Sequence, residues 1–370
     1  MKTAQALNYT KKLISISSDS GNEQAISSYI QETVATLGSV QTIEQSVVLH
    51  IVGKDQTKAL IFNGHIDTVP AGTLWQTQPL TAVEKNGKLY GLGASDMKSG
   101  VGIMLQLAND FANQQPPCDM WFMFVEQEET DGRGTKKVLD VLPNFTNAYP
   151  GGVEGFILEP TNSTYVAIGH KGNIFVTLTF DGQGGHGSME LPYQQRASHK
   201  AAHFIQQLPR IAQSWKTTYT HAILGEPTIN VTNIESVGSK ALNAVPQSVL
   251  VSLDIRTTPK LSAQFAAAID ALATTYGATY SYPYKPNGYG LCSEDSQLLA
   301  IAKKQFAVKD IRVFQGASDQ LFFTANNIPM LIYGPGTDTV MHQPNEYVEI
   351  SAIDRTYDVL QSFIAHFTDQ

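Results

Sequence analysis

Short apolar segments alternate with helical patterns along much of this 370-residue sequence. Four of these segments have the length of buried strands and are bordered by turn-forming residues: residues 59–62, 121–125, 155–158 and 330–333. Apolar residues recur at helical spacing in three others: residues 25–37, 98–111 and 353–367. This alternation predicts an α/β fold in which helices cover a mixed sheet.

The pattern changes near Asn173. From there the composition predicts strand, helix, strand, strand and helix, at residues 173–180, 198–215, 228–234, 248–256 and 262–276. A unit of this size can form a domain of its own. The α/β pattern resumes after a Pro/Gly/Tyr-rich segment at residues 282–290. We therefore predict a smaller α+β domain at residues 173–286, inserted into a larger domain of residues 1–172 and 287–370.

Charge and composition argue against several classes of protein. Acidic residues outnumber basic ones 33 to 25, and no run of Lys/Arg could neutralise a row of phosphates, so we expect no nucleic-acid partner. The two cysteines, Cys118 and Cys292, lack the spacing of a disulfide framework or a cysteine zinc site. No stretch of about 18 apolar residues occurs and the first residues lack a signal-peptide core, which predicts a soluble cytoplasmic protein with no membrane association.

Polar residues that could bind a metal follow the predicted strands. His65 and Asp67 come after residues 59–62 and lie on the same side of an extended chain. An imidazole that binds a metal needs its second ring nitrogen fixed by a neighbour, and Asp67 could do this for His65. The alternative is an ordinary polar strand end.

Carboxylates occur at two further positions of this kind. Asp96 lies in a glycine-rich turn before residues 98–111, where it is either exposed at the sheet edge or caps the helix. Glu128 and Glu129 follow residues 121–125 in an acidic run, which is costly to bury unless the charges are paired or bound to cations. Because neighbours on an extended chain point to opposite sides, one could bind a metal while the other acts as a base. The alternative is an acidic surface turn.

Glu159 and His342 complete the set of candidates. Glu159 follows residues 155–158 and precedes a proline that stops the strand. His342 lies in a loop beyond residues 330–333, and loops at strand ends are where open α/β sheets build their sites. Taken singly, an acidic strand end and a solvated loop histidine are ordinary features.

Five candidate ligands lie at or after predicted strand ends of the larger domain: His65, Asp96, Glu129, Glu159 and His342. Two histidines and three carboxylates can give each of two metal ions one histidine and one terminal carboxylate, with the third carboxylate as a bridge. This donor set suits zinc, and cobalt or manganese could replace it.

The motifs that carry these residues occur in a recognisable order. They read GHIDTVP, YGLGASDMKSG, EETDGRGT, ILEP, GGHGS, LNAVP with DIR, GASD, and GPG followed by MHQPNEYV. Over essentially its whole length the chain resembles the two-zinc metallopeptidase family of succinyl-diaminopimelate desuccinylase, acetylornithine deacetylase, aminoacylase and glutamate carboxypeptidase.

This resemblance implies a role for each candidate. The implied zinc ligands are His65 and Glu159 for one ion, Glu129 and His342 for the other, and Asp96 as the bridge. Asp67 would orient His65. Glu128 would be the general base that takes a proton from the attacking water.

The resemblance also implies a homodimer. The larger domain would be catalytic and the inserted domain would serve as a dimerisation or lid domain. His186 would reach across the dimer and polarise the scissile carbonyl in the partner's site. Asn243 and Arg256 would hold the carboxylate or backbone of the substrate, and Ser318 of GASD is a further expected substrate contact.

The expected reaction is hydrolysis of the amide bond of a small N-acyl amino acid. GASD is similar to the GTSD segment of desuccinylases, which favours N-succinyl-LL-2,6-diaminopimelate as substrate and succinate and LL-diaminopimelate as products. The chain departs from desuccinylases by having His170, Asn173, Met189 and Ala317 in place of arginine, serine, tyrosine and threonine.

The lost arginine matters because its planar fork pairs with a carboxylate such as the succinyl tail, although Lys171 could supply a point charge. An acetylornithine-type deacetylase or a dipeptidase is therefore the alternative enzyme. A metal-free binding protein is a further alternative, but no ligand or base is missing. A purely structural dimerisation module would leave the acidic strand ends unexplained.

Overall fold

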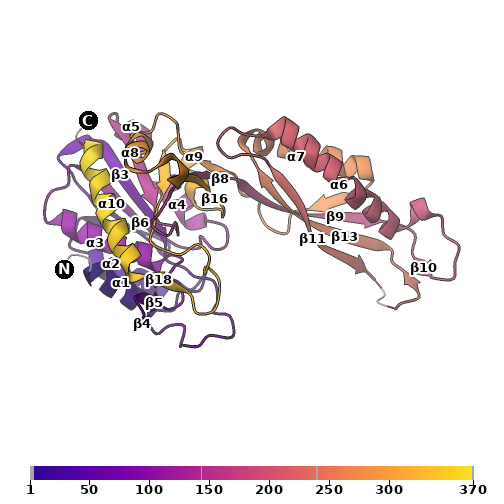
Figure 1. Cartoon of the computed structure of the whole chain (residues 1–370), viewed down its shortest axis with the longest axis horizontal. Helices are drawn as coiled ribbons and strands as arrows, with labels where there is room; N and C mark the ends of the chain where they lie inside the picture. Colours follow the sequence, from indigo (N-terminus) through magenta and orange to yellow (C-terminus); the bar gives the residue numbers. More distant parts are fainter. Residues whose placement is uncertain (1–3, 143, 239–240, 369–370) are drawn as a thin grey trace. The chain divides into compact units, whose positions relative to one another are not determined.

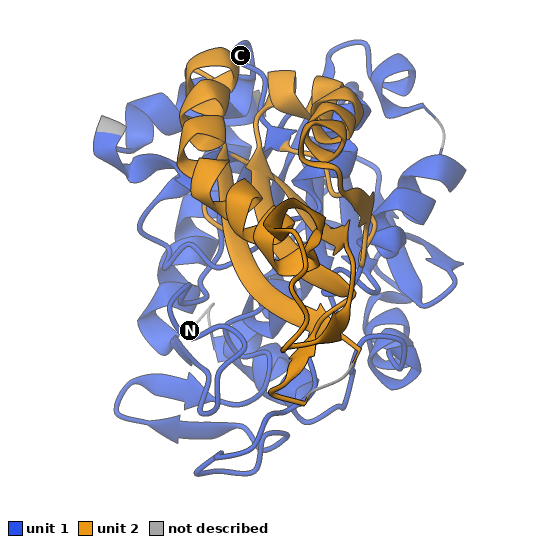
Figure 2. Ribbon diagram, turned by 90° about the vertical axis from the view of Figure 1, so that its right-hand side faces the viewer, with its two compact units in different colours: residues 1–169, 290–314, 318–370 blue, residues 170–289, 315–317 orange. Residues whose placement is uncertain are grey.

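The computed structural model describes residues 4–142, 144–238 and 241–368. The chain divides into two compact units, shown in Figure 2. Unit 1 holds Met1–Gly169, Gly290–Phe314 and Ser318–Gln370, and unit 2 holds His170–Tyr289 and Gln315–Ala317. The predicted inserted segment, residues 173–286, lies inside unit 2. The unit extends to Tyr289 because Asn287 pairs with Asn173.

Unit 1 is built around a nine-stranded mixed sheet. The strand order is β1-β2-β6-β3-β7-β17-β8-β15, and β16 pairs with β8. The bounds are β1 (Ser39–Ile43), β2 (Ser46–Ile51), β3 (Asp55–His65), β6 (Cys118–Val125), β7 (Gly152–Ile157), β8 (Val166–His170), β15 (Gly290–Leu291), β16 (Ile311–Phe314) and β17 (Met330–Ile332). β3 runs parallel to β6 and β7, and β17 runs parallel to β7. The residues after these strands therefore meet at one edge of the sheet.

Helices cover both faces of this sheet. The first face carries α1 (Ala4–Ile14), α2 (Gln24–Val34), α3 (Lys98–Ala112), α8 (Gln297–Gln305) and α10 (Ile350–Thr368), the last drawn in yellow in Figure 1. The second face carries α4 (Arg133–Val141), α5 (Phe145–Ala148) and α9 (Gln320–Ala325). A 3-10 turn at Val308–Asp310 precedes β16.

The central strands are apolar on both faces, as the sequence indicated. Leu60 and Phe62 of β3 pack into the first core, whereas Ala59 and Ile61 pack into the second. Leu60, Ile61 and Phe62 each contribute roughly 1.5–3 kcal/mol when they are removed from water. Because strand residues alternate between faces, continuous apolar composition fits a strand that is buried on both sides.

A small three-stranded sheet in unit 1 joins two distant segments of the chain. It has the order β18-β5-β4, with bounds β18 (Tyr347–Glu349), β5 (Lys88–Tyr90) and β4 (Val83–Lys85). Tyr347 pairs with Tyr90, so the segment after His342 lies beside the segment that leads to Asp96.

Unit 2 is an antiparallel sheet with two long helices. The strand order is β11-β13-β9-β14, with bounds β9 (Gly172–Asp181), β11 (Thr228–Val237), β13 (Ser248–Thr257) and β14 (Thr279–Ser281). The helices α6 (Ala197–Tyr219) and α7 (Pro259–Tyr276) cover one face, as Figure 1 shows. Burial alternates strictly along β9 and β13, because only that face meets the helices.

Three short strands of unit 2 were absent from the sequence prediction. These are β14 and the two-stranded ladder of β10 (Gly185–His186) and β12 (Ala244–Val245). A 3-10 turn at Tyr193–Gln195 precedes α6. Two or three residues carry too little periodicity to predict a strand, so these elements depend on partners that are distant in sequence.

The predicted fold class, a mixed sheet covered by helices with a smaller α+β unit, is confirmed. Within the described part of the chain, no helix combines the length and the apolar composition needed to cross a membrane.

Candidate metal centre

His65, the last residue of β3, lies at the middle of a buried cluster of carboxylates. Its side chain is 1% exposed. The Nδ1 atom lies 2.9 Å from the backbone oxygen of Asp67 and 3.4 Å from the Asp67 carboxylate. The Nε2 atom lies 3.0 Å from Asp96 Oδ1 and 3.7 Å from Glu159 Oε1. One ring nitrogen is thus held by Asp67 while the other faces two carboxylates.

Asp67 contacts the backbone of the acidic run as well as the histidine. The backbone N–H groups of Glu128 and Glu129 donate to its two carboxylate oxygens at 3.1 and 3.2 Å. The hydroxyl of Ser20 donates to the same carboxylate at 2.7 Å. Asp67 therefore connects His65 to the two glutamates that follow β6.

The acidic run turns sharply after β6, and this turn separates its members. Gln127 has a φ of 53°, in the left-handed region, and its N–H donates to Glu23 Oε1 at 3.2 Å. Before the turn, Glu126 points elsewhere and accepts from the backbone of Gln45 at 3.0 Å. After it, Glu128 and Glu129 both join the cluster around His65.

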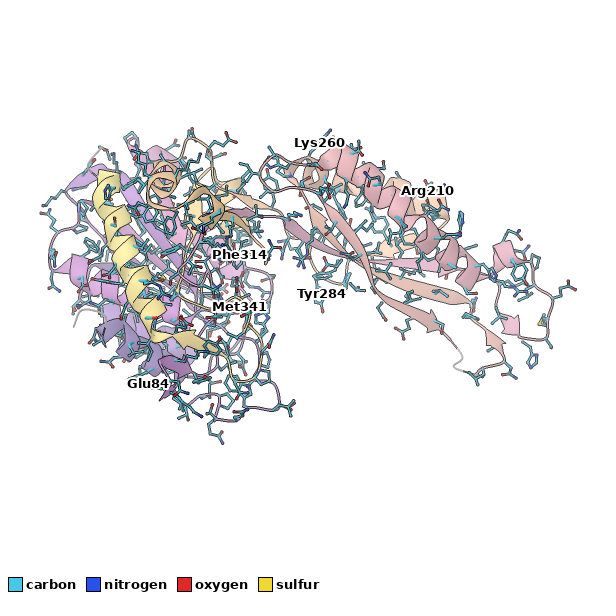
Figure 3. The ribbon with its side chains drawn as sticks, in the orientation of Figure 1. Glu84, Arg210, Lys260, Tyr284, Phe314 and Met341 are labelled. Carbon is cyan, nitrogen blue, oxygen red and sulfur yellow. The ribbon has the colours of Figure 1, made fainter. Side chains whose placement is uncertain are left out.

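Asp96 lies between the two candidate histidines. Its Oδ1 atom faces His65, and its Oδ2 atom lies 3.4 Å from His342 Nε2. His342 also contacts Glu129 at 3.0 Å and is half exposed, whereas Asp96 is buried. Met341, labelled in Figure 3, marks the loop that carries His342. The five candidate ligands therefore lie in one cluster within unit 1.

Among the residues that the structure describes, two groups of side chains have ligand atoms close enough to share an ion. His65, Asp96 and Glu129 form one group, and His65, Glu128 and Glu159 form the other, with all ligand atoms of a group within 4.8 Å of one another. This grouping differs from the division that the resemblance implies, because it places Glu128 beside Glu159 and Glu129 beside His65. His65 occurs in both groups, and His342 occurs in neither.

The charges in this cluster are unbalanced without a cation. Burial, together with the charge of Glu159, raises the pKa of Glu128 well above its usual value, and burial and Asp96 do the same to the pKa of Glu159. Burial likewise raises the pKa of Glu129. Ionisation of these three glutamates is therefore disfavoured unless positive charge enters the cluster. The pKa of Asp96 is lowered instead, because hydrogen bonds with His342 and His65 outweigh its burial.

The pKa values of the two histidines are raised as well, because the surrounding carboxylates favour the protonated imidazole. Burial lowers the pKa of His65, but hydrogen bonds with Asp67 and Asp96 outweigh burial and raise it well above its usual value. Hydrogen bonds with Asp96 and Glu129 raise the pKa of His342 to about 10. A divalent cation could replace these protons on the imidazoles and allow the carboxylates to ionise, so the donor set fits a metal.

Two acidic residues near the cluster were missed by the sequence reasoning. Asp319 is buried and accepts from Thr135 Oγ1 at 2.5 Å, and burial raises its pKa to about 7. Glu346 is buried and accepts backbone N–H groups of the Asp96 turn. Both stand in the quoted motifs, GASD and MHQPNEYV, but a motif does not show what a buried carboxylate contacts.

The candidate substrate residues are distributed over both units. Ser318 belongs to unit 1 and is only 2% exposed, and its hydroxyl accepts from the backbone of Gln320 at the start of α9. His186 and Asn243 belong to unit 2 and are exposed. Their side chains meet at 3.1 Å because His186 of β10 pairs with Ala244 of β12.

Arg256 of unit 2 has a partner that the sequence reasoning did not assign. Its Nε and Nη2 atoms donate to the two carboxylate oxygens of Asp254 at 2.9 and 3.1 Å. The two residues lie on the same face of β13 because they are two positions apart. The two-residue spacing of Asp254 and Arg256 in the DIR motif was the sequence signal that could have predicted this contact.

Relatives of known name match along nearly the whole chain. Succinyl-diaminopimelate desuccinylase of Rickettsia bellii is 26% identical over 96% of this chain and 95% of its own length. The enzyme of the same name from Herminiimonas arsenicoxydans is also 26% identical, over 95% of this chain and 96% of its own.

Solved structures share the fold. A tripeptidase from Staphylococcus aureus has a TM-score of 0.79 at 20% identity and covers 100% of this chain and 99% of its own. A dinuclear metal-binding peptidase from Bacillus subtilis has a TM-score of 0.70 at 14% identity, with 99% of each chain covered.

Residues 61–366 match the Peptidase family M20/M25/M40, and this range begins in β3, just before His65, and ends in α10. The matched range contains all five candidate metal ligands as well as Glu128. The chain therefore belongs to the M20/M25/M40 peptidase family and is a hydrolytic enzyme.

Proposed function

We propose that this enzyme uses two metal ions to hydrolyse the amide bond of a small N-acyl amino acid. The observation that carries the proposal is the buried cluster in which Asp96 lies between His65 and His342, with Glu128 beside it. The preferred substrate is N-succinyl-LL-2,6-diaminopimelate. Support for this choice comes from relatives named succinyl-diaminopimelate desuccinylase that match along nearly the whole chain.

Each ion would take one histidine and one terminal carboxylate. The proposed ligands are His65 and Glu159 for one ion, Glu129 and His342 for the other, and Asp96 for both. Histidine nitrogens with carboxylate oxygens suit zinc, and cobalt or manganese could substitute. When bound, two such cations polarise the scissile carbonyl and make nearby water easier to deprotonate.

Glu128 is the proposed general base. It takes a proton from the attacking water and transfers it to the nitrogen of the amine as the C–N bond breaks. Asp67 holds the backbone of Glu128 and the ring of His65, which supports a role for Asp67 in orienting both. The backbone of the proposed base is thus held close to a proposed metal ligand, which favours proton transfer over a short distance.

Three further proposed roles belong to residues of unit 2, and one belongs to Ser318 of unit 1. His186 would act in the active site of the partner subunit of a homodimer, where it donates to the oxygen of the scissile carbonyl. Its exposure and its contact with Asn243 support this role. Arg256 and Asn243 would bind the carboxylate or backbone of the substrate. For Arg256, binding exchanges the Asp254 carboxylate for that of the substrate. Ser318 would contribute a further substrate contact.

A dipeptidase or an acetylornithine-type deacetylase is the second candidate. Histidine and asparagine stand at positions 170 and 173, where desuccinylases carry arginine and serine, and His170 is fully buried. The solved relatives also include a tripeptidase and a dipeptidase. A substrate without a succinyl carboxylate has no need of the lost arginine.

Amine release from a panel of N-succinyl, N-acetyl and dipeptide substrates tests these proposals. The protein is stripped of metal, reloaded with zinc and compared with Glu128→Gln. Zinc-dependent release from succinyl-diaminopimelate that collapses in the variant supports the desuccinylase. Preference for acetyl or dipeptide substrates keeps the mechanism and replaces the substrate. Absence of zinc-dependent release from every compound contradicts the proposed function.

A further inference from the structure

Glu346 binds the backbone of the turn that carries Asp96. The side chain of Glu346 is 2% exposed, and its carboxylate accepts three backbone N–H groups. Gly93 donates to Oε2 at 2.9 Å, while Ser95 and Asp96 donate to Oε1 at 2.7 and 2.9 Å. Asp96, the proposed bridging ligand, therefore donates its own backbone N–H to Glu346.

Neighbouring hydrogen bonds also hold together the segments that Glu346 connects. The backbone oxygen of Glu346 accepts from Gly91 at 3.1 Å, and the next residue enters β18, which pairs with β5. On another side of the turn, the Ser95 hydroxyl donates to the backbone oxygen of Thr337 at 2.9 Å. The Asp96 turn is thus held by two segments of the loop region that follows β17.

The loop that carries Glu346 also carries His342, four residues earlier in the chain. His342 lies 3.4 Å from the carboxylate of Asp96 and 3.0 Å from that of Glu129. The same loop therefore contacts Asp96 twice. His342 contacts its side chain, and Glu346 accepts its backbone N–H. A shift of either residue would change the distance between Asp96 and His342.

We propose that Glu346 is a positioning residue that holds the Asp96 turn against the His342 loop, so that Asp96, Glu129 and His342 form a preassembled site for one metal ion. This inference rests on the proposed function, because it assumes that two ions bind. It assigns Glu346 no contact with metal or substrate. Its effect falls more on the ion that His342 binds than on the other ion. Asp96 and His342, the two residues that Glu346 connects, are both proposed ligands of that ion, whereas His65 ends β3 and Glu159 closely follows β7.

A carboxylate suits this role for a chemical reason. Both of its oxygens accept hydrogen bonds, so it can serve three donors at once, whereas a glutamine side chain offers one acceptor oxygen and one amide group that only donates. In Glu346→Gln, at least one of the three N–H groups faces another donor.

The chain offers a matched control in Glu154 at the start of β7. This buried carboxylate accepts from the Ser296 hydroxyl and from the backbone N–H groups of Gln297 and Leu298, at 2.7, 2.7 and 2.8 Å. It thus makes the same kind of contacts as Glu346, but at the opposite end of β7 from Glu159. A second control is Glu349, a half-exposed glutamate in β18.

The test is titration of metal-free protein with Co²⁺, followed by visible absorption, which resolves the two binding steps. We expect Glu346→Gln to bind the second ion about 10- to 100-fold more weakly, the effect of losing a contact that orients a ligand, and the first ion to be affected much less. Glu154→Gln should lower the midpoint of thermal unfolding and leave both binding steps unchanged. Glu349→Gln should change neither property.

Several results would overturn the inference. Wild-type affinity for both ions in Glu346→Gln shows that the residue does not position the site. Equal weakening of both steps shows general distortion instead. If the wild-type protein takes up no Co²⁺, both the proposed function and this inference fail. If the wild-type protein binds two ions and Glu346→Gln binds them equally well, this inference alone fails. Should circular dichroism show that Glu346→Gln is unfolded, Glu346→Asp retains two acceptor oxygens with a shorter reach, and the same selective loss is expected.

Discussion

The Oδ1 atom of Asp67 accepts a hydrogen bond from the backbone nitrogen of Glu128 at 3.1 Å. The same carboxylate accepts a hydrogen bond from the backbone nitrogen of Glu129. The backbone oxygen of Asp67 also contacts the Nδ1 atom of His65. Asp67 therefore links the end of β3 to the turn after β6. A residue expected to orient one histidine in fact contacts three of the residues on which the proposed mechanism depends.

Asp67→Asn should weaken both metal binding and turnover. Asparagine keeps one acceptor oxygen and places its amide donor against the N–H group of either Glu128 or Glu129. We expect about a 10- to 100-fold loss in metal affinity and in kcat. The measurement is a zinc titration against a chelator, combined with steady-state kinetics. Ser20→Ala is the control, because it removes only the hydroxyl that donates to Asp67 and should change both values little. Equal effects of the two variants would contradict the role of Asp67.

Glu128→Gln should separate catalysis from metal binding. The variant cannot accept the proton from water, so kcat should fall by about 100- to 10,000-fold while KM changes little. Metal content measured by atomic absorption should stay at the wild-type level. Glu129→Gln should instead reduce metal content, because the resemblance assigns that side chain to an ion. Substantial turnover by Glu128→Gln would remove Glu128 from the mechanism.

Mixed dimers test whether His186 acts across subunits. Glu128→Gln and His186→Ala should each be nearly inactive alone. If each site combines Glu128 of one subunit with His186 of the other, a mixed dimer has one intact site. Random exchange then restores about a quarter of wild-type activity, since about half of the dimers are mixed. Activity no higher than that of the separate variants after verified subunit exchange would contradict action across a dimer.

Both cysteines should be unreactive in the folded protein at neutral pH. Burial raises the pKa of the Cys118 thiol and of the Cys292 thiol to about 12. The thiolate is the reactive form, so its fraction is small below this pH and grows only as the pH approaches 12. Reaction with a disulfide reagent near pH 8 should be slow in the native protein and rapid in denaturant. Single Cys→Ala variants assign the two sites. A fast native reaction would show that a buried thiol becomes exposed.

Local pattern was sufficient to predict the strands β3, β6, β7 and β17 and the helices α2, α3 and α10 of unit 1, but not its other strands and helices. The apolar residues of β3 and β6 are buried on both faces of the sheet, and such composition is readable from a few neighbouring residues. Parallel strands also gather their ends at one edge, so listing polar residues after strands identified His65, Glu129 and Glu159 before any contact was known. The order of the motifs predicted the family, and the family match over residues 61–366 confirms this prediction.

Contacts between distant segments could not be predicted in this way. The strands β10, β12 and β14 are too short for any periodicity, and they exist because partners far along the chain pair with them. The contact of Arg256 with Asp254 left a trace in the sequence, a spacing of two within a strand, but only the structure shows the hydrogen bonds.

By itself, the sequence determined the alternation of buried strands and helices, the family of the enzyme and the residue types at the strand ends. These follow from side-chain chemistry and short-range spacing. The tertiary structure alone decided which carboxylate touches which donor: Asp67 on the amides after β6, and Glu346 on the turn of Asp96. The reason is that a buried carboxylate must find hydrogen-bond donors, and folding brings those donors from segments that are up to hundreds of positions away.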